Sequence, residues 1–98
     1  MLNGSEILTV NPAVAMQDTD GELVVVLPDQ GKYVVLNATG TRVTQMVNGK
    51  KTLFEIAVEI SESFDTDLDQ VKKDVLAFSK DLISRGILRI VDIDNLNE

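Results

Sequence analysis

Three aspartates alternate with other residues at Asp65, Asp67 and Asp69, and closely spaced carboxylates of this kind are ligands that Ca²⁺ prefers. The D-x-D-x-D spacing is typical of the start of an EF-hand loop, which needs glycine at its sixth position and glutamate at its twelfth. Those positions here are Gln70 and Leu76, so the loop is incomplete. Acidic residues also cap helices and suit the helix dipole at the first turn. We therefore expect these aspartates to start a helix and not to bind a metal ion.

Nucleophilic catalysis has little support in the sequence. Ser61, Ser63, Ser79 and Ser84 have no histidine to activate them, because the chain contains none, and it contains no cysteine either. The same two absences remove thiol nucleophiles, disulfides and the usual zinc ligands. No glycine-rich phosphate loop is present. We predict a protein that is not an enzyme and that binds no cofactor or metal.

The charge of the chain argues against a phosphate-binding surface. The 98 residues carry 9 basic and 16 acidic side chains, a net charge of −7, and the basic ones are scattered. Non-specific binding to nucleic acids needs clustered Lys and Arg. In the last predicted helix Lys72, Lys73 and Lys80 are balanced by three aspartates. We expect a partner that is basic, or one bound through backbone and apolar contacts, and keep a winged-helix DNA-binding or transcription-related module as the alternative.

Two periodicities divide the chain, and the change between them falls within Leu36–Thr52. Before this stretch the apolar residues form short β-type runs such as LVVV and YVVL, and β-branched residues favour strands. Turn sequences separate three predicted strands, Ala13–Gln17, Glu22–Leu27 and Lys32–Leu36. After it, apolar residues recur every three or four positions, which predicts helices.

The second half of the chain predicts three helices. The first runs over Thr39–Val47, the second starts with a capping box at Thr52 and Glu55, and the third runs over Asp67–Ser84. A further strand fits Ile87–Val91. The predicted fold class is α+β: an N-terminal antiparallel β-hairpin or three-stranded sheet followed by three helices, similar to a winged helix-turn-helix.

We expect residues 1–98 to form a single domain with its core at about 12–91 and with flexible segments at 1–11 and 92–98. Ile7–Val10 fits either a short strand or a part of the first tail. No secretory signal and no apolar run of membrane-spanning length is present, so we predict a cytoplasmic protein.

The strand Lys32–Leu36 has an unpaired edge unless another strand covers it, and such edges are usually blocked or used. An extended peptide could add there as a further strand, with its side chains toward the last helix. The predicted peptide-binding residues are Tyr33, Val34, Val35 and Leu36 on the strand and Lys72, Val75, Leu76 and Ser79 on the helix. Val75 also fits an ordinary core position, and Lys72 and Ser79 fit an ordinary surface. An exposed edge also allows two copies to pair as a homodimer.

The order of short motifs between about Tyr33 and Leu88 resembles the PqqD family, the pyrroloquinoline quinone synthesis protein D type. The motifs are Leu36-Asn37, Ala38-Thr39-Gly40, Asn48-Gly49, Lys51-Thr52, Glu55-Ile56, Phe64-Asp65, Asp74-Val75 with Leu76 and Phe78, Leu82, and Arg85-Gly86-Ile87-Leu88. They are specific as a set and not one by one. Many members carry tryptophan in the first helix where this chain has Thr44.

The resemblance implies a function. Such domains are recognition elements for ribosomally made, post-translationally modified peptides: they hold the leader segment of a precursor peptide in the cleft between the strand and the last helix. They present the core segment to a modifying enzyme, often a radical SAM protein. The resemblance thus implies a non-enzymatic adaptor, with a leader peptide and a radical SAM or other peptide-modifying enzyme as its partners.

Overall fold

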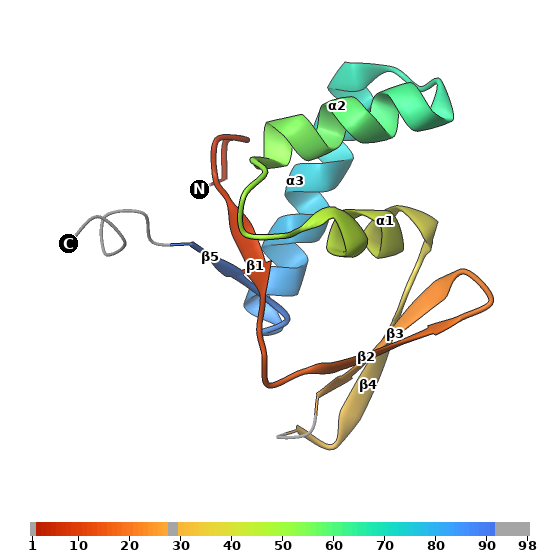
Figure 1. Cartoon of the computed structure of the whole chain (residues 1–98), viewed down its shortest axis with the longest axis vertical. Helices are drawn as coiled ribbons and strands as arrows, with labels where there is room; N and C mark the ends of the chain where they lie inside the picture. The colour runs from red at the N-terminus through yellow and green to blue at the C-terminus, as the bar shows by residue number, and fades with distance from the viewer. Residues whose placement is uncertain (1, 28–29, 92–98) are drawn as a thin grey trace.

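The β-branched run Glu22–Leu27 forms β3, the central strand of a three-stranded antiparallel sheet with the order β2-β3-β4. The computed structural model, which describes residues 2–27 and 30–91, gives β2 as Ala15–Thr19 and β4 as Lys32–Leu36 (Figure 1). The predicted bounds of β3 and β4 are confirmed. The first strand begins at Ala15 and not at Ala13, because Ala13 belongs to a turn in which its N–H donates to the side chain of Asn11.

A two-residue turn joins β2 to β3. Asp20 and Gly21 form it, with φ angles of 53° and 85°. Positive φ at both central positions gives a type I′ turn, whose twist matches that of the flanking strands, and Asp-Gly is a sequence that favours it. The turn sets a register in which Thr19 lies opposite Glu22. Every second side chain of β3, starting with Leu23, then points into the core.

The second and third helices begin at the caps that the sequence predicts, whereas the first begins and ends one residue before its predicted bounds, Thr39 and Val47. The bounds of the three helices are Ala38–Met46 for α1, Leu53–Phe64 for α2 and Leu68–Ser84 for α3. Asn37, Thr52 and Asp67 each accept a backbone N–H of the following first turn, and Glu55 returns a bond to the N–H of Thr52. The predicted α+β fold, a sheet followed by three helices, is confirmed for the described part of the chain.

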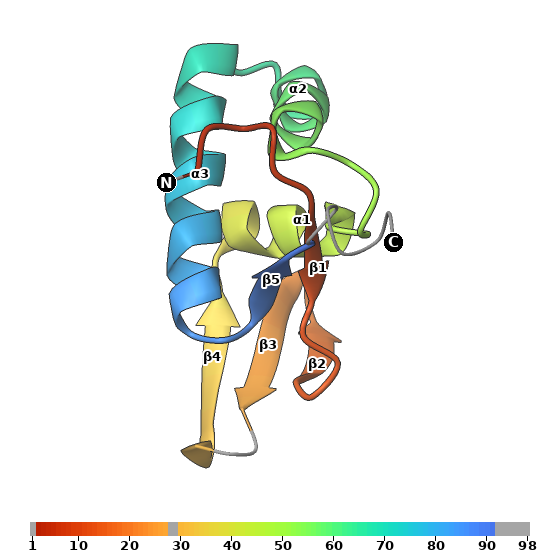
Figure 2. The ribbon, with the colours of Figure 1, turned by 90° about the vertical axis from the view of Figure 1, so that its left-hand side faces the viewer.

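The core lies between the inner face of the sheet and the helices. Figure 2 shows α1 placed between the sheet and α2, with α3 running along one side, and α3 packs against both other helices. The core includes Leu23, Val25, Leu36, Val43, Ile56, Ile60, Val75 and Leu82. Burial of these side chains is the main stabilising term of a domain of this size.

A second, two-stranded sheet joins the ends of the described chain. β1 (Leu8–Val10) pairs antiparallel with β5 (Leu88–Ile90), and Leu8 is fully buried. The structure therefore differs from the expected flexible segment over residues 1–11. The three-residue strand is too short to show a periodicity, and it is stabilised by a partner at the far end of the chain. The predicted strand at Ile87–Val91 is confirmed as β5, whereas residues 92–98 lie outside the described residues.

One side chain joins the sheet to α1. The buried hydroxyl of Thr41 accepts the N–H of Leu23 in β3 at 3.1 Å and donates to the C=O of Leu36 in β4 at 3.2 Å. Leu23 and Leu36 face each other across the two strands. The hydroxyl is therefore inserted where the ladder would otherwise make its own hydrogen bond, and it satisfies two backbone groups that are cut off from water.

Replacing Thr41 by Val should destabilise the protein by about 1–3 kcal/mol, because the isosteric side chain leaves a buried N–H and C=O without partners. Thr44→Val is the matched control, one turn later on the same helix. The Thr44 hydroxyl is buried but has no hydrogen-bond partner, so its removal should be neutral or stabilising. Chemical denaturation of both variants measures the difference. Equal losses of stability would contradict the bridging role of Thr41.

The N-terminal segment has a pH-dependent anchor in Glu6. Its carboxylate accepts the N–H groups of Asn3 and Gly4 at 2.9 to 3.1 Å. Slight burial raises the pKa of Glu6, but backbone hydrogen bonds outweigh it and hold this pKa below the ordinary value of 4.5.

Glu6→Gln should therefore lower the stability at neutral pH, and the difference from the wild type should vanish in acid. The sign follows from the lowered pKa: the contribution is complete above the unfolded-state pKa of 4.5 and is lost as the pH falls through the folded-state pKa. Urea denaturation of both proteins from about pH 7 down to about pH 3 tests this. A difference that is the same across the range would exclude the carboxylate as its cause.

Candidate functional site

β4 lies at the edge of its sheet. It pairs with β3 on one side, and no strand among the described residues pairs with its other side. Figure 2 shows this outer side facing away from β2 and β3, below α3. An unpaired strand exposes a row of backbone N–H and C=O groups that another extended chain can bond to.

The Thr41 bridge shows which groups of β4 are free. The C=O of Leu36 points toward β3, since the Thr41 hydroxyl reaches both this oxygen and the N–H of Leu23. Backbone groups alternate in direction along an antiparallel strand, so Val34 also points toward β3. The N–H and C=O groups of Tyr33 and Val35 consequently point outward. The free edge presents two residues with the spacing that a further strand requires.

The side chains of β4 divide between two faces. Val34 and Leu36 lie opposite Val25 and Leu23 and point toward the helices, with Leu36 buried. Tyr33 and Val35 point to the outer face of the sheet, where they are 71% and 51% exposed. The four predicted strand residues are therefore contiguous along the edge but do not share one face.

The side of α3 next to β4 carries Phe78. A methyl group placed on Gly40 would lie 3.3 Å from the Phe78 ring, so the ring packs on the first turn of α1, directly after β4. Phe78 is half-buried. Phe78 recurs at helical spacing with Val75 and Leu82, so the sequence predicts a core position for it and does not indicate its place beside the edge strand. The glycine at position 40 is the one signal of a close approach there.

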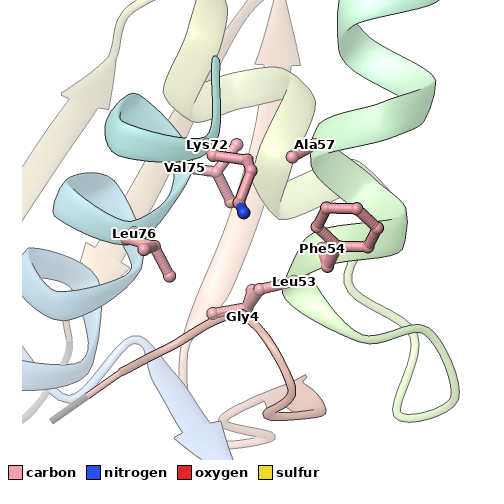
Figure 3. A pocket seen from close by; sticks show the side chains of 7 residues that line it. All are labelled: Gly4, Leu53, Phe54, Ala57, Lys72, Val75 and Leu76. Carbon is pink, nitrogen blue, oxygen red and sulfur yellow. The ribbon is translucent and has the colours of Figure 1, made fainter. Parts of the chain in front are cut away.

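The predicted helix residues face elsewhere. Lys72, Val75 and Leu76 line a shallow hollow that also includes Gly4 and Phe54, as Figure 3 shows. Positions two residues apart on a helix point about 200° apart, so Leu76 and Phe78 lie on opposite sides of α3. The structure therefore does not bring the predicted strand residues and the predicted helix residues together in one groove.

Two of the predicted helix residues are wholly buried. Val75 belongs to the core, and Ser79 has no hydrogen-bond partner for its hydroxyl. Lys72 places its ammonium group 4.9 Å from the ring centroid of Phe54, a cation–π contact that holds its side chain over α2. Lys72 and Leu76 therefore remain at the surface, on the side of α3 that faces the N-terminal segment.

A small hollow opens where the sheet meets the end of α3. It measures about 170 Å³ and includes Leu27, which lies opposite Lys32 at the start of β4, together with Gln30 and Arg85. Arg85 donates to the carboxylate of Asp81 at 3.0 Å, and both side chains are about half exposed. The hollow thus combines apolar side chains with the charged side chain of Arg85.

The acidic residues that suggested a calcium loop have a structural role. Asp67 caps α3, and Asp65 ends α2 in the left-handed conformation. Within residues 2–27 and 30–91, no group of three acidic, histidine or cysteine side chains converges on a point where a metal ion could bind. The helices described also include none that is both long and apolar enough to cross a membrane.

Solved structures share this arrangement of strands and helices. The chain is similar to TbiB1, whose structure was determined in complex with the TbiA(β) leader peptide. The sequences are 26% identical, the TM-score is 0.74, and the match covers 82% of this chain and 93% of TbiB1.

Two more distant likenesses support the fold alone. A lasso peptide synthetase B1, complexed with the leader peptide, matches with a TM-score of 0.75 and 18% identity, over 84% of this chain and 96% of its own. The PqqD truncation of Methylobacterium extorquens PqqCD, described as a stand-alone RiPP recognition element, matches with a TM-score of 0.77 and 20% identity. That match covers 91% of this chain and 95% of the truncation.

No curated protein matches the chain. The family model of coenzyme PQQ synthesis protein D, in contrast, matches residues 22–88, which run from the start of β3 to the first residue of β5. This span is more than half of the sequence and holds the edge strand and all three described helices. The chain belongs to the PqqD family.

Proposed function

We propose that this chain is a non-enzymatic adaptor that binds the leader segment of a ribosomally made precursor peptide as an added strand on β4 and presents the peptide to a separate modifying enzyme. The observation that carries this proposal is the open edge of β4, with the backbone groups of Tyr33 and Val35 directed outward. The 26% identity with TbiB1, which was solved with a leader peptide, supports the same role.

The leader peptide would bind mainly through its backbone. Two of its residues, spaced two apart, would exchange hydrogen bonds with Tyr33 and Val35 and continue the sheet as a fourth strand. Strand addition needs no particular side chains for these bonds. Recognition of one leader over another then comes from the side chains that alternate above and below the added strand.

The inward side chains of the leader would meet the surface between β4 and α3. We keep Tyr33, Val34, Val35 and Leu36 in the proposed site, and Phe78 takes the place on α3 that the sequence pattern gives to Leu76. We assign the remaining predicted residues on α3 no direct contact with the added strand. They are Lys72, which reaches toward Phe54, and Val75 and Ser79, which lie beneath the surface.

The interface of such a complex is small. A short added strand buries less than the roughly 1,200 Å² of an interface of ordinary size, so an affinity near a dissociation constant of about 1 μM is expected. Weak binding suits an adaptor, because the modified peptide must leave. The modifying enzyme that we propose as the second partner is of the radical SAM type or another peptide-modifying class.

The same edge can also accept a second copy of the chain. In an antiparallel pair of β4 strands centred on Val34, Tyr33 of one copy would lie opposite Val35 of the other, and aromatic and β-branched residues pair well across strands. We propose that such a homodimer and the leader complex exclude each other, since both use the outward groups of Tyr33 and Val35.

Titration of the isotope-labelled protein with the leader of a precursor peptide encoded beside it tests the site. Amide shifts should concentrate at residues 32–36 and near Phe78, because the added strand covers them. Shifts confined to other surfaces, or no shifts with the leader, would contradict the proposal. The hollow beside Gly4 and Phe54 is an internal comparison, since the leader should leave its amides unchanged.

Val35→Pro gives a sharper test of strand addition. Proline removes the outward N–H of residue 35 but leaves the hydrogen bonds between β4 and β3, so leader affinity should fall at least about tenfold while the fold remains. Val35→Ala is the matched control, since it also loses the valine side chain but keeps the N–H. If the alanine variant loses as much affinity as the proline variant, side-chain contact and not strand pairing holds the leader.

Sedimentation measures the competing homodimer. Any dimer of the wild type should dissociate as the leader is added and should be absent from Val35→Pro, because both remove the edge that the second copy needs. A dimer that persists in the presence of saturating leader would show that the copies associate through another surface.

A further inference from the structure

The outward face of α2 carries apolar side chains that the core does not use. Phe54 is 43% exposed near the start of the helix, and Val58, one turn later on the same face, is half-buried. A groove of about 320 Å³ runs along this face, lined by Lys51, Phe54, Glu55, Val58 and Glu59. A helix that packs one face on a core normally shows polar groups on the other. Exposed aromatic residues beside a groove indicate an interaction surface.

Charge decides what such a surface can bind. Residues 51–71, which contain α2, its connection to α3 and the first turn of α3, carry six acidic side chains against one basic, Lys51. Lys51 is itself paired with Glu59 at 2.8 Å. The rest of the chain carries ten acidic and eight basic side chains, so most of the net charge of −7 lies on this one part. The groove itself has an apolar floor and a rim with one excess negative charge, Glu55 and Glu59 against Lys51, and it lies within this acidic part of the chain.

The groove lies away from the proposed leader site. Figures 1 and 2 both place α2 at the end of the molecule opposite the sheet β2-β3-β4. α2 packs on α3 and α1, with β4 on the far side of α1. A chain bound to the edge of β4 would leave this face of α2 open, so the two surfaces can be occupied together.

We infer that the groove on α2 binds a basic segment of the modifying enzyme, in which a large apolar side chain lies between Phe54 and Val58 and flanking Lys or Arg residues face Glu55 in the groove and Glu62, one turn beyond it on the same face of α2. This inference rests on the proposed function, because an adaptor needs one surface for the peptide and another for the enzyme. A second copy of the chain does not fit, since the acidic parts of the two copies would repel each other. An added leader strand does not fit either, because the backbone of a helix offers no free edge.

The test measures the affinity of the purified peptide-modifying enzyme encoded beside this protein for the full chain and its variants, by calorimetry or fluorescence anisotropy. Phe54→Ala removes a wall of the groove, and Glu62→Lys reverses an exposed charge one turn beyond the groove on the same face of α2. Each should weaken enzyme binding about tenfold, as expected for an anchor residue and for a close charge of the wrong sign. Raising the salt from about 0.05 M to about 0.5 M should weaken the wild-type complex as well.

Matched controls lie elsewhere on the same chain. Phe64→Ala truncates another exposed phenylalanine, 57% exposed, that does not line the groove, and Glu22→Lys reverses an exposed charge on the sheet. Both should bind the enzyme like the wild type. Thermal melting of every variant excludes unfolding as the cause of a loss.

Two independent readouts separate this inference from the proposed function. Leader affinity, measured for each variant without enzyme, should stay unchanged in Phe54→Ala and Glu62→Lys. A wild-type protein that binds the enzyme but not the leader would overturn the proposed function and leave the groove standing. Three outcomes would overturn the inference. Enzyme binding could be unaffected by Phe54→Ala and Glu62→Lys, it could fall equally in the control variants, or it could be absent in a wild type that binds the leader.

Discussion

The arrangement of this protein depends on the hydroxyl of Thr41, which lies between two strands and a helix. It accepts from Leu23 of β3 and donates to Leu36 of β4, while its own backbone continues α1. The bond sits at the end of β4, at the pair of Leu23 and Leu36, and shows which backbone groups of this strand face inward. The direction of Val34 toward β3, and of Tyr33 and Val35 away from it, follows from the strict alternation of an antiparallel strand. A single buried contact on the inner face, together with the register of β3 and β4, thus shows which backbone groups the outer edge presents.

Local sequence signals predicted much of the fold. The bounds of β3 and β4, the Asp-Gly turn and the capping box of Thr52 and Glu55 all follow from residues within a few positions of one another. The pairing of β1 with β5 could not be read in this way, because a three-residue strand carries no periodicity and its partner is far along the chain. The Thr41 bridge is equally hidden, since one threonine in a helix pattern does not indicate which backbone groups it will meet.

The candidate site shows where a helical pattern is insufficient. The sequence indicates that α3 has two apolar sides, one with Leu76 and one with Phe78, but not which of them faces β4. That depends on the side from which α1 approaches. The approach is possible because Gly40 has no side chain, which lets the Phe78 ring lie against the first turn of α1. The strand half of the site could therefore be predicted from its edge position, whereas the helix half required the packing of α1 on α3.

The open edge of β4 conflicts with the usual protection of exposed strands. Natural edges carry inward-pointing charges, proline or a bulge that prevents pairing with other chains. β4 has a single charged residue, Lys32, at its start, and its central residues are aromatic and β-branched. Such a strand tends to pair with any extended chain that it meets. Natural selection would have blocked the edge if strand pairing had no role in this protein. The net charge of −7 offers one compensation, because like charge on every copy disfavours association without placing a charge on the edge itself. The edge can then stay apolar and free for a peptide.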